Sequence, residues 1–211
     1  MRFLVTAGPT QEPIDPVRYI SNRSSGRMGY AVAEAAIEAG HSVTLVSGPV
    51  CLEQPAGAKV IPVTTAAEMQ SAVNGNLADA DVLVMCAAVA DYRPAQFSAQ
   101  KIKKSGASLS LELTPTPDIL KSLPANEKCL VVGFAAETNE LEENGKNKLQ
   151  TKNLDLIVAN DVSRSDIGME SANNEVIILF RNGKTKTIER TSKKNIAREL
   201  VKIISNMKKN V

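Results

Sequence analysis

The sequence has one histidine and no tryptophan, and only 3% of its 211 residues are aromatic. A single histidine, His41, weakens every mechanism that needs a catalytic imidazole, including Ser-His-Asp catalysis, Cys-His catalysis and most zinc hydrolases. Few aromatic side chains leave few platforms on which single-stranded nucleic acid could stack. Because the formal net charge is only +2, we predict no nucleic acid partner.

Cysteines and long apolar runs are also scarce. Cys51, Cys86 and Cys129 are widely spaced and form no CxxC pair, which favours neither a disulfide framework nor a zinc site. No apolar run has the length of a membrane span, and Met1 leads directly into RFLVTA with no room for a signal peptide. We therefore expect a cytoplasmic protein with no membrane partner.

Apolar runs of strand length alternate with helical patterns over residues 1–160. These runs are FLVTA (3–7), SVTLVS (42–47), VIPVT (60–64), DVLVMCAAVA (81–90), CLVVGFAA (129–136) and LDLIVAN (154–160). Strands that are apolar on both faces and separated by helices indicate a parallel sheet that is covered on both sides.

The pattern changes after residue 160. EVIILFRNG and KTKTIER predict a hairpin around Asn182 and Gly183, and TSKKNIARELVKIISNMKK predicts a terminal amphipathic helix. We therefore predict an α/β protein with a Rossmann-like parallel sheet and helices on both faces, extended by a C-terminal β-hairpin and helix. Residues 1–211 are expected to form a single domain.

The connection after the first strand, GPTQEPIDPVRYISNRSSGRMG (8–29), is unusually long and rich in proline. Some of its polar side chains should face a charged ligand; they are Thr10, Asp15, Arg18, Asn22, Ser24, Ser25 and Arg27. SSGRMG (24–29) is typical either of a phosphate site at a helix start or of a serine N-cap. The chain lacks GxGxxG, and Ser47 and Gly48 stand where NAD enzymes carry an acidic residue.

Four further stretches are candidates for ligand contacts. In AAVADYR (87–93), Asp91 could hold a ribose, an amine or magnesium, or it could cap a helix or pair with Arg93. KIKKSG (101–106) is either a mobile flap over phosphates or a solvated face, and Lys148 and Lys152 on one helix face either add charge or only aid solubility. TPTPDI (114–119) pins the backbone before a short helix, and Phe134 serves either base stacking or the core.

Together these stretches resemble the phosphopantothenate–cysteine ligases of coenzyme A biosynthesis, of the bacterial CTP-dependent type. The matching motifs are GPTQEPIDPVRYISNRSSGRMG, AAVADYRP, KIKK, PDI, VGFAAET and NLDLIVAND, and they cover essentially the whole chain. The resemblance implies two steps: the carboxylate of 4'-phosphopantothenate attacks the α-phosphate of CTP and releases pyrophosphate, and the cysteine amine then displaces CMP. It also implies Mg²⁺.

The resemblance assigns site residues, each carried onto a matching position of this chain. The residues implied in catalysis are Asn22, Asp91 and Lys101. Nucleotide contacts are implied for Met85, Cys86, Ala87, Asp91, Lys101, Pro117, Asp118, Ile119, Leu120, Phe134, Lys148 and Lys152. Substrate contacts are expected for Asn22, Ser24, Ser25, Gly26, Ala87 and Ala88. No metal ligand is assigned.

The resemblance also bears on partners. The flavin-dependent decarboxylase half that is fused to many bacterial ligases is absent, so we expect no flavin, and a phosphopantothenoylcysteine decarboxylase remains a candidate partner. Family members are usually dimers whose strands after the Rossmann core meet across a two-fold. We expect Ile177 and Leu179, in the apolar run 176–180, to lie at such an exposed edge.

Two other functions stay open at this point. A nicotinamide-dependent reductase would share the fold but needs the missing glycine fingerprint. A nucleotide-binding regulatory module would keep the sheet but release no pyrophosphate from CTP and phosphopantothenate.

Overall fold

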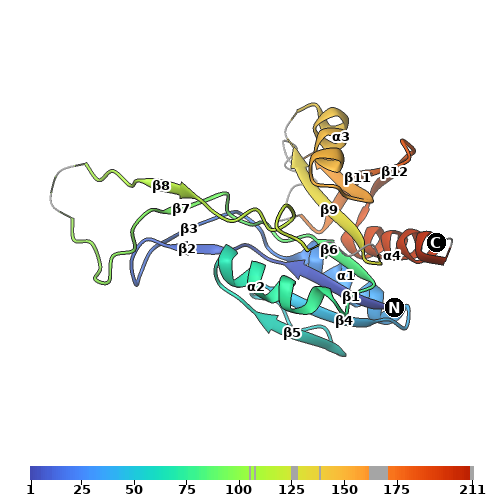
Figure 1. Ribbon diagram of the computed structural model, residues 1–211, viewed down its shortest axis with the longest axis horizontal. Coiled ribbons are helices and arrows are strands. Elements are labelled where there is room, and N and C mark those ends of the chain that lie inside the picture. Colours follow the sequence, from blue (N-terminus) through green and yellow to red (C-terminus); the bar gives the residue numbers. More distant parts are fainter. Residues whose placement is uncertain (105, 107, 125–127, 138, 162–170, 210–211) are drawn as a thin grey trace.

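The computed structural model describes the chain except for residues 105, 107, 125–127, 138, 162–170 and 210–211. Its body is an eight-stranded sheet (Figure 1) in which six parallel strands are followed by an antiparallel hairpin at one edge. Across the sheet the order is β5 (Ala58–Pro62), β4 (Ser42–Ser47), β1 (Arg2–Ala7), β6 (Val82–Met85), β9 (Leu130–Glu137), β10 (Leu156–Asp161), β11 (Asn173–Phe180) and β12 (Thr185–Ser192). This architecture confirms the predicted fold class.

Helices cover both faces of the sheet. On one face α1 (Arg27–Glu38) and α4 (Lys193–Lys209) pack against each other, and on the other face lie α2 (Ala66–Leu77) and α3 (Leu141–Thr151). Successive strand residues point to opposite faces, so Phe3 and Val5 pack with α1 and α4 whereas Leu4 packs with α2. The central strands are therefore buried on both sides, as their continuous apolar runs predict.

The chain order creates a switch point in the sheet. From β1 the chain moves outward through β4 to β5, and it then returns to β6 on the other side of β1 before moving to β9 and β10. In open α/β sheets ligands bind beyond the carboxyl ends of the strands at such a reversal. The long loop after β1 and the AAVADYR segment after β6 both leave the sheet at this point.

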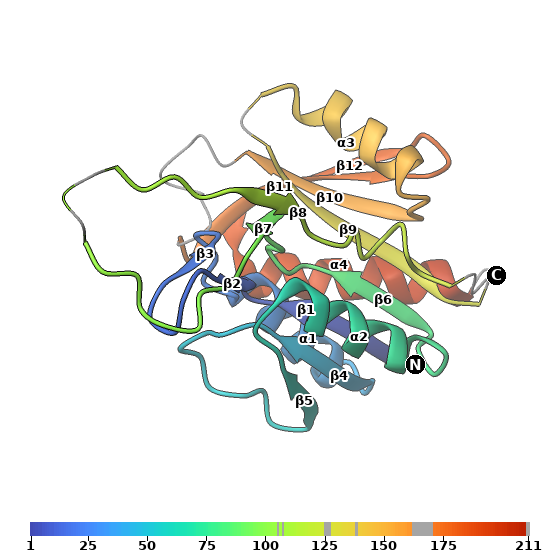
Figure 2. The same cartoon turned by 60° about the vertical axis from the view of Figure 1, so that its left-hand side comes forward.

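Two small ribbons form an arm that projects from the body (Figures 1 and 2). One pairs β2 (Gln11–Pro13) with β3 (Tyr19–Ser21), and the other pairs β7 (Tyr92–Pro94) with β8 (Leu113–Pro115). The Ser98 N–H donates to the Ile14 carbonyl at 3.0 Å and ties the two ribbons together. No local sequence pattern predicted this arm.

The arm also carries the large hydrophobic side chains that are exposed in the described part of the chain. All of the large hydrophobic side chains that are exposed there belong to it or to its turns: Val17, Tyr19, Tyr92, Phe97, Leu109, Leu111 and Leu113.

The expected exposed edge at residues 176–180 is wrong. β12 covers β11, so β12 forms the edge, and Leu179 is only 1% exposed because it packs under α3. Ile177 is partly buried beside the same cluster.

Candidate active site

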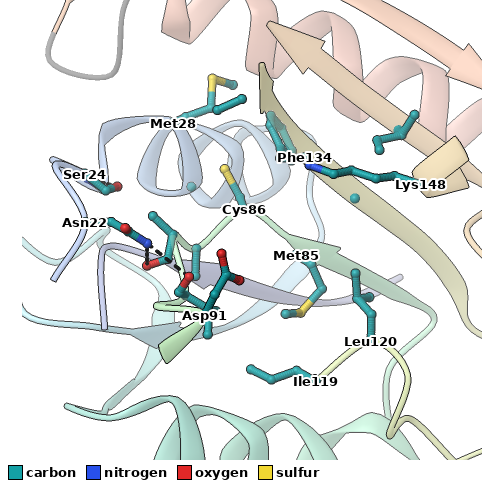
Figure 3. A pocket seen from close by; sticks show the side chains of 18 of the residues that line it. Asn22, Ser24, Met28, Met85, Cys86, Asp91, Ile119, Leu120, Phe134 and Lys148 are labelled. Carbon is teal, nitrogen blue, oxygen red and sulfur yellow. Dashed lines mark hydrogen bonds between the residues drawn. The ribbon is translucent and has the colours of Figure 1, made fainter. Parts of the chain in front are cut away.

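A cavity of about 670 Å³ lies at the switch point between β1 and β6. Figure 3 shows how distant segments surround it: Asn22 and Ser24 lie on one side, Phe134 and Lys148 on another, and Ile119 and Leu120 below. Its size is typical of a site for a small ligand or cofactor.

Two buried threonines shape the wall that follows β6. Thr6 Oγ1 accepts the N–H groups of Cys86 and Ala87, both at 3.1 Å, and thereby fixes the backbone directly after β6. Thr10 Oγ1 accepts the Ala90 N–H at 2.9 Å. The segment between these anchors lines the cavity with its small side chains, as its alanines predict.

Asn22 joins the loop after β3 to this wall. Its Nδ2 donates to the carbonyls of Ala88 at 3.2 Å and Val89 at 3.0 Å, drawn as dashed lines in Figure 3. Asp91 also lines the cavity. The alternative pairing of Asp91 with Arg93 does not occur, since the Arg93 guanidinium instead donates to the Pro94 carbonyl at 3.4 Å.

The start of α1 forms a second wall. Gly26 is the N-cap residue and has φ 75°, in the left-handed region that favours glycine, and no side chain caps the helix. The serine N-cap alternative is therefore not what the structure contains. Ser24, Ser25 and Gly26 line the cavity, which is where an anion would meet the positive end of the helix dipole.

Two lysines close the cavity from the side of α3. Lys148 Nζ donates to Glu137 Oε1 at 2.6 Å, and Lys152 Nζ forms an ion pair with Asp118. Burial alone would raise the pKa of Asp118, but the hydrogen bonds from Lys152 and the Lys121 N–H and the charges of both lysines hold it below its usual value. Both lysines thus face the cavity, each with a carboxylate beside it.

The segment 117–120 and Phe134 complete the site. Pro117, Asp118, Ile119 and Leu120 line the cavity, and a turn over residues 119–122 stands in place of the expected short helix. Ile119 is anchored in the core under α2, which holds this turn in place. Phe134 lines the cavity and also packs on the α1–α4 side of the core, so its position is compatible with both roles considered for it.

Lys101 is not brought to this cavity. It lies on the arm, where the backbone of the next residue, Ile102, is held by Asp15 and Arg18. The implied site residues that line the cavity are Asn22, Ser24, Ser25, Gly26, Met85, Cys86, Ala87, Ala88, Asp91, Pro117, Asp118, Ile119, Leu120, Phe134, Lys148 and Lys152. Ser105 of KIKKSG and Thr138 of VGFAAET lie outside the described residues.

Sequence reasoning missed several lining residues, among them Asn160, Asn174 and Lys193. Lys193 begins α4 and is 6% exposed. Burial lowers its pKa, and the nearby positive charge of Arg27 lowers it further. No local motif marks this lysine, because only the packing of the last helix against α1 brings it to the cavity.

The cysteine in the cavity is not set up as a nucleophile. Burial raises the pKa of the Cys86 thiol to about 12, so it stays protonated at neutral pH. Among the described residues no group of three His, Cys, Asp or Glu side chains could hold a metal ion, and no helix is long and apolar enough to cross a membrane.

Fold and cavity together define a Rossmann-like α/β domain whose ligand site combines a helix start, two lysines and an exposed backbone wall, a combination suited to a phosphorylated ligand. Over residues 1–207 the sequence matches the DNA/pantothenate metabolism flavoprotein C-terminal domain, and the chain belongs to this family.

Relatives and solved structures agree with that assignment. The coenzyme A biosynthesis bifunctional protein CoaBC of Vibrio vulnificus is 46% identical over 209 residues, which are 97% of this chain and 52% of that protein. CoaBC of Escherichia coli is 48% identical over 188 residues, 87% of this chain and 46% of that protein. The crystal structure of the C-terminal domain of a CoaBC protein matches with a TM-score of 0.85 at 41% identity, covering 100% of this chain and 96% of that one. This chain spans about half the length of the curated relatives it matches.

Proposed function

We propose that this chain catalyses the CTP-dependent ligation of 4'-phosphopantothenate and cysteine in coenzyme A biosynthesis. The observation that carries the proposal is the convergence of Asn22, the wall after β6 and the Lys148–Lys152 pair on one cavity. Relatives that match nearly the whole chain are coenzyme A biosynthesis proteins. We propose that residues 1–211 act as one ligase domain in the cytoplasm.

The first step forms a bond between the substrate carboxylate and the α-phosphorus of CTP and breaks the bond to pyrophosphate. In the second step the cysteine amine attacks the activated carbonyl, CMP leaves, and the amine loses a proton. Neither step needs an imidazole, because positioning and charge stabilisation can supply much of the rate. This suits a chain whose only histidine, His41, lies outside the cavity lining.

The cavity residues have distinct parts in this proposal. The start of α1 and the wall after β6 hold the acyl phosphate, and Asn22 orients it. Lys148 and Lys152 exchange Glu137 and Asp118 for nucleotide phosphates when CTP binds, since a charged phosphate oxygen is a comparable partner for an ammonium group. The turn 117–120 and Phe134 surround the base.

The site is compatible with a magnesium ion that binds together with the nucleotide. Mg²⁺ is commonly held by one or two carboxylates together with substrate phosphates and water, and Asp91 supplies a carboxylate in the cavity. When bound, the ion would neutralise charge on the triphosphate. We propose that the chain itself uses no flavin and that a phosphopantothenoylcysteine decarboxylase consumes its product.

Pyrophosphate release tests the function directly. Wild-type chain should release pyrophosphate from CTP plus phosphopantothenate, and the amide should form only when cysteine is added. Discrimination against ATP should reach ~10⁴-fold in kcat/KM, because the wrong base leaves buried polar groups unpaired. A kcat/KM with ATP comparable to that with CTP would contradict the assignment of CTP as the nucleotide. If no nucleotide gives pyrophosphate, the proposed ligase function is wrong.

A matched pair of variants in α3 tests the site. Lys148→Met should raise the KM for CTP, whereas Lys146→Met should not, because Lys146 makes a surface ion pair with Glu142 at 3.3 Å and does not line the cavity. Equal effects of the two variants would place the nucleotide elsewhere.

We also propose that the chain acts as a homodimer joined through the arm. This proposal replaces the expected contact at residues 176–180. The arm is favoured because it carries the exposed apolar side chains, and a symmetric partner would offer the same surface in return.

A further inference from the structure

The turn between β2 and β3 holds a buried carboxylate. Asp15 is 2% exposed, and its Oδ1 accepts the N–H groups of Val17 and Arg18, both at 2.9 Å. Its Oδ2 accepts Arg18 Nε at 3.0 Å and Arg18 Nη2 at 2.5 Å. The Arg18 guanidinium, supported by these backbone N–H groups and opposed by burial, holds the pKa of Asp15 well below its usual range.

This ion pair reaches across the arm to the lysine segment 101–104. Asp15 Oδ2 also accepts the Ile102 N–H at 3.1 Å, and Arg18 Nη2 donates to the Ile102 carbonyl at 3.0 Å. Both backbone polar groups of one residue are therefore bound by a single ion pair more than 80 positions away in the sequence. Lys101 and Lys103 flank the bound residue directly.

The contact changes how the lysine segment can move. An irregular exposed loop normally samples many conformations, and ordering its residues costs backbone entropy. Here the charge-assisted bonds at Ile102 offset part of that cost, and the Ser98–Ile14 bond adds a second tie between the same two ribbons. The segment is thus attached to the β2–β3 turn rather than free.

We propose that Asp15, together with Arg18, is a positioning residue that sets the location of Lys101 by fixing the backbone of Ile102, so that the lysine segment moves with the β2–β3 turn. Neither Asp15 nor Arg18 lines the cavity, so their effect on the reaction passes through the segment they hold. The catalytic part of this inference rests on the proposed function and on the catalytic role that the family resemblance implies for Lys101; the structural part rests on neither.

Amide hydrogen exchange tests the structural part. In the wild-type chain the Ile102 amide should exchange slowly, and Asp15→Asn should speed its exchange by about 10-fold or more, because the neutral amide loses the charge-assisted bonds. Glu38→Gln is the matched control. It breaks another bidentate pair, with Arg198 at 2.8 and 3.1 Å, on the body of the molecule. Exchange at Ile102 that is equally fast in wild type and Asp15→Asn would overturn the proposal.

A double-mutant cycle tests the catalytic part. Asp15→Asn and Lys101→Ala should each lower kcat for pyrophosphate release, and the double variant should be no slower than Lys101→Ala, because Asp15 has nothing left to position. If the fold-losses in kcat of the two single variants multiply in the double variant, Asp15 acts by another route and the proposal is overturned. Glu38→Gln should leave kcat unchanged.

Arg18→Lys covers the case in which Asp15→Asn does not fold. A lysine can keep the charge next to Asp15 but lacks the planar fork that also reaches the Ile102 carbonyl. It should therefore speed exchange at Ile102 while the melting temperature stays near that of wild type, and slow exchange in this variant would contradict the proposal. If the wild-type chain releases no pyrophosphate, the proposed function fails, and the exchange measurement decides the positioning role by itself.

Discussion

At the scale of single residues, Asn22 shows how one side chain links two walls of the cavity. Its amide donates to two carbonyls, those of Ala88 and Val89. An aspartate of the same size has no hydrogen to donate there and would direct negative charge at both oxygens. Asn22→Asp tests the position with little change in volume.

We expect Asn22→Asp to lower ligase kcat/KM by about 10²-fold, the usual effect of losing one preorganised donor. The two lost hydrogen bonds should lower the melting temperature by roughly 2–8 °C. Asn76→Asp is the control, since Asn76 also donates its amide to a carbonyl, that of Ala72 at 2.8 Å, but lies in α2 away from the cavity. Full activity of Asn22→Asp in the pyrophosphate assay would place Asn22 outside the site.

His41 gives the second prediction at this scale. Its ring stacks on Phe3 with centroids 5.2 Å apart, and its Nε2 lies 3.2 Å from Ser205 Oγ. Burial lowers its pKa from 6.5, and the amino terminus and Lys209 lower it further. The folded chain therefore favours neutral imidazole.

A lowered histidine pKa means that stability is complete above the unfolded-state value of 6.5 and is lost as the pH falls below it. We expect the melting temperature to fall between about pH 7.5 and 5.5, a window above the range where carboxylates titrate. His41→Gln should flatten that decline. Thermal melts of both proteins across the window check this, and an unchanged slope in the variant would contradict it.

At the scale of elements, the contact between α1 and β1 decides the shape of the cavity. A Cβ at Gly29 would lie 2.6 Å from Ala7 Cβ and 2.9 Å from the Thr6 carbonyl oxygen. Because the backbone and side chain of the buried strand β1 block the added Cβ, α1 itself would have to move. Since α1 forms one wall of the cavity, this movement would change the shape of the site.

Gly29→Ala should therefore destabilise by about 1–3 kcal/mol, which corresponds to roughly 2–10 °C in melting temperature, and should weaken substrate binding. The matched control is Gly75→Ala in α2, where a Cβ meets nothing within 4 Å. That change should stabilise by about 0.5–1 kcal/mol, because alanine loses less entropy in a helix. The prediction is wrong if both variants shift the melting temperature in the same direction.

At the scale of the whole molecule, the arm carries the exposed hydrophobic side chains that the proposed dimer would cover. We expect light scattering at micromolar concentration to give twice the chain mass. Leu111→Glu, which adds a charge to the exposed apolar side of the arm, should shift the population toward monomer.

Thr187→Glu is the control for that experiment. It adds the same charge to the edge strand β12, next to the hairpin strand where the contact was first expected, and it should leave the dimer intact. If Thr187→Glu dissociates the dimer and Leu111→Glu does not, the interface lies at the hairpin and not at the arm. If the wild-type protein is a monomer over this concentration range, the dimer proposal is wrong.

The positions of the central strands, the hairpin turn and part of the cavity wall could be predicted from the sequence alone. The apolar runs at 3–7 and 42–47 and the first half of the run at 81–90 favour strands buried on both sides, and β1, β4 and β6 confirm this. Asn182–Gly183 permits the tight turn of the hairpin. The small residues at 87–88 also favour backbone open to a ligand, whereas SSGRMG by itself was equally compatible with a serine N-cap.

Only the tertiary structure decided which distant residues meet. Lys193 reaches the cavity because α4 packs on α1, Lys101 lies apart from it because Asp15 and Arg18 hold Ile102, and Leu179 is buried because β12 and α3 cover it. Each outcome depends on contacts between segments far apart in the chain. Periodicity and local motifs record which face of an element is apolar, but they do not record which other element will cover that face.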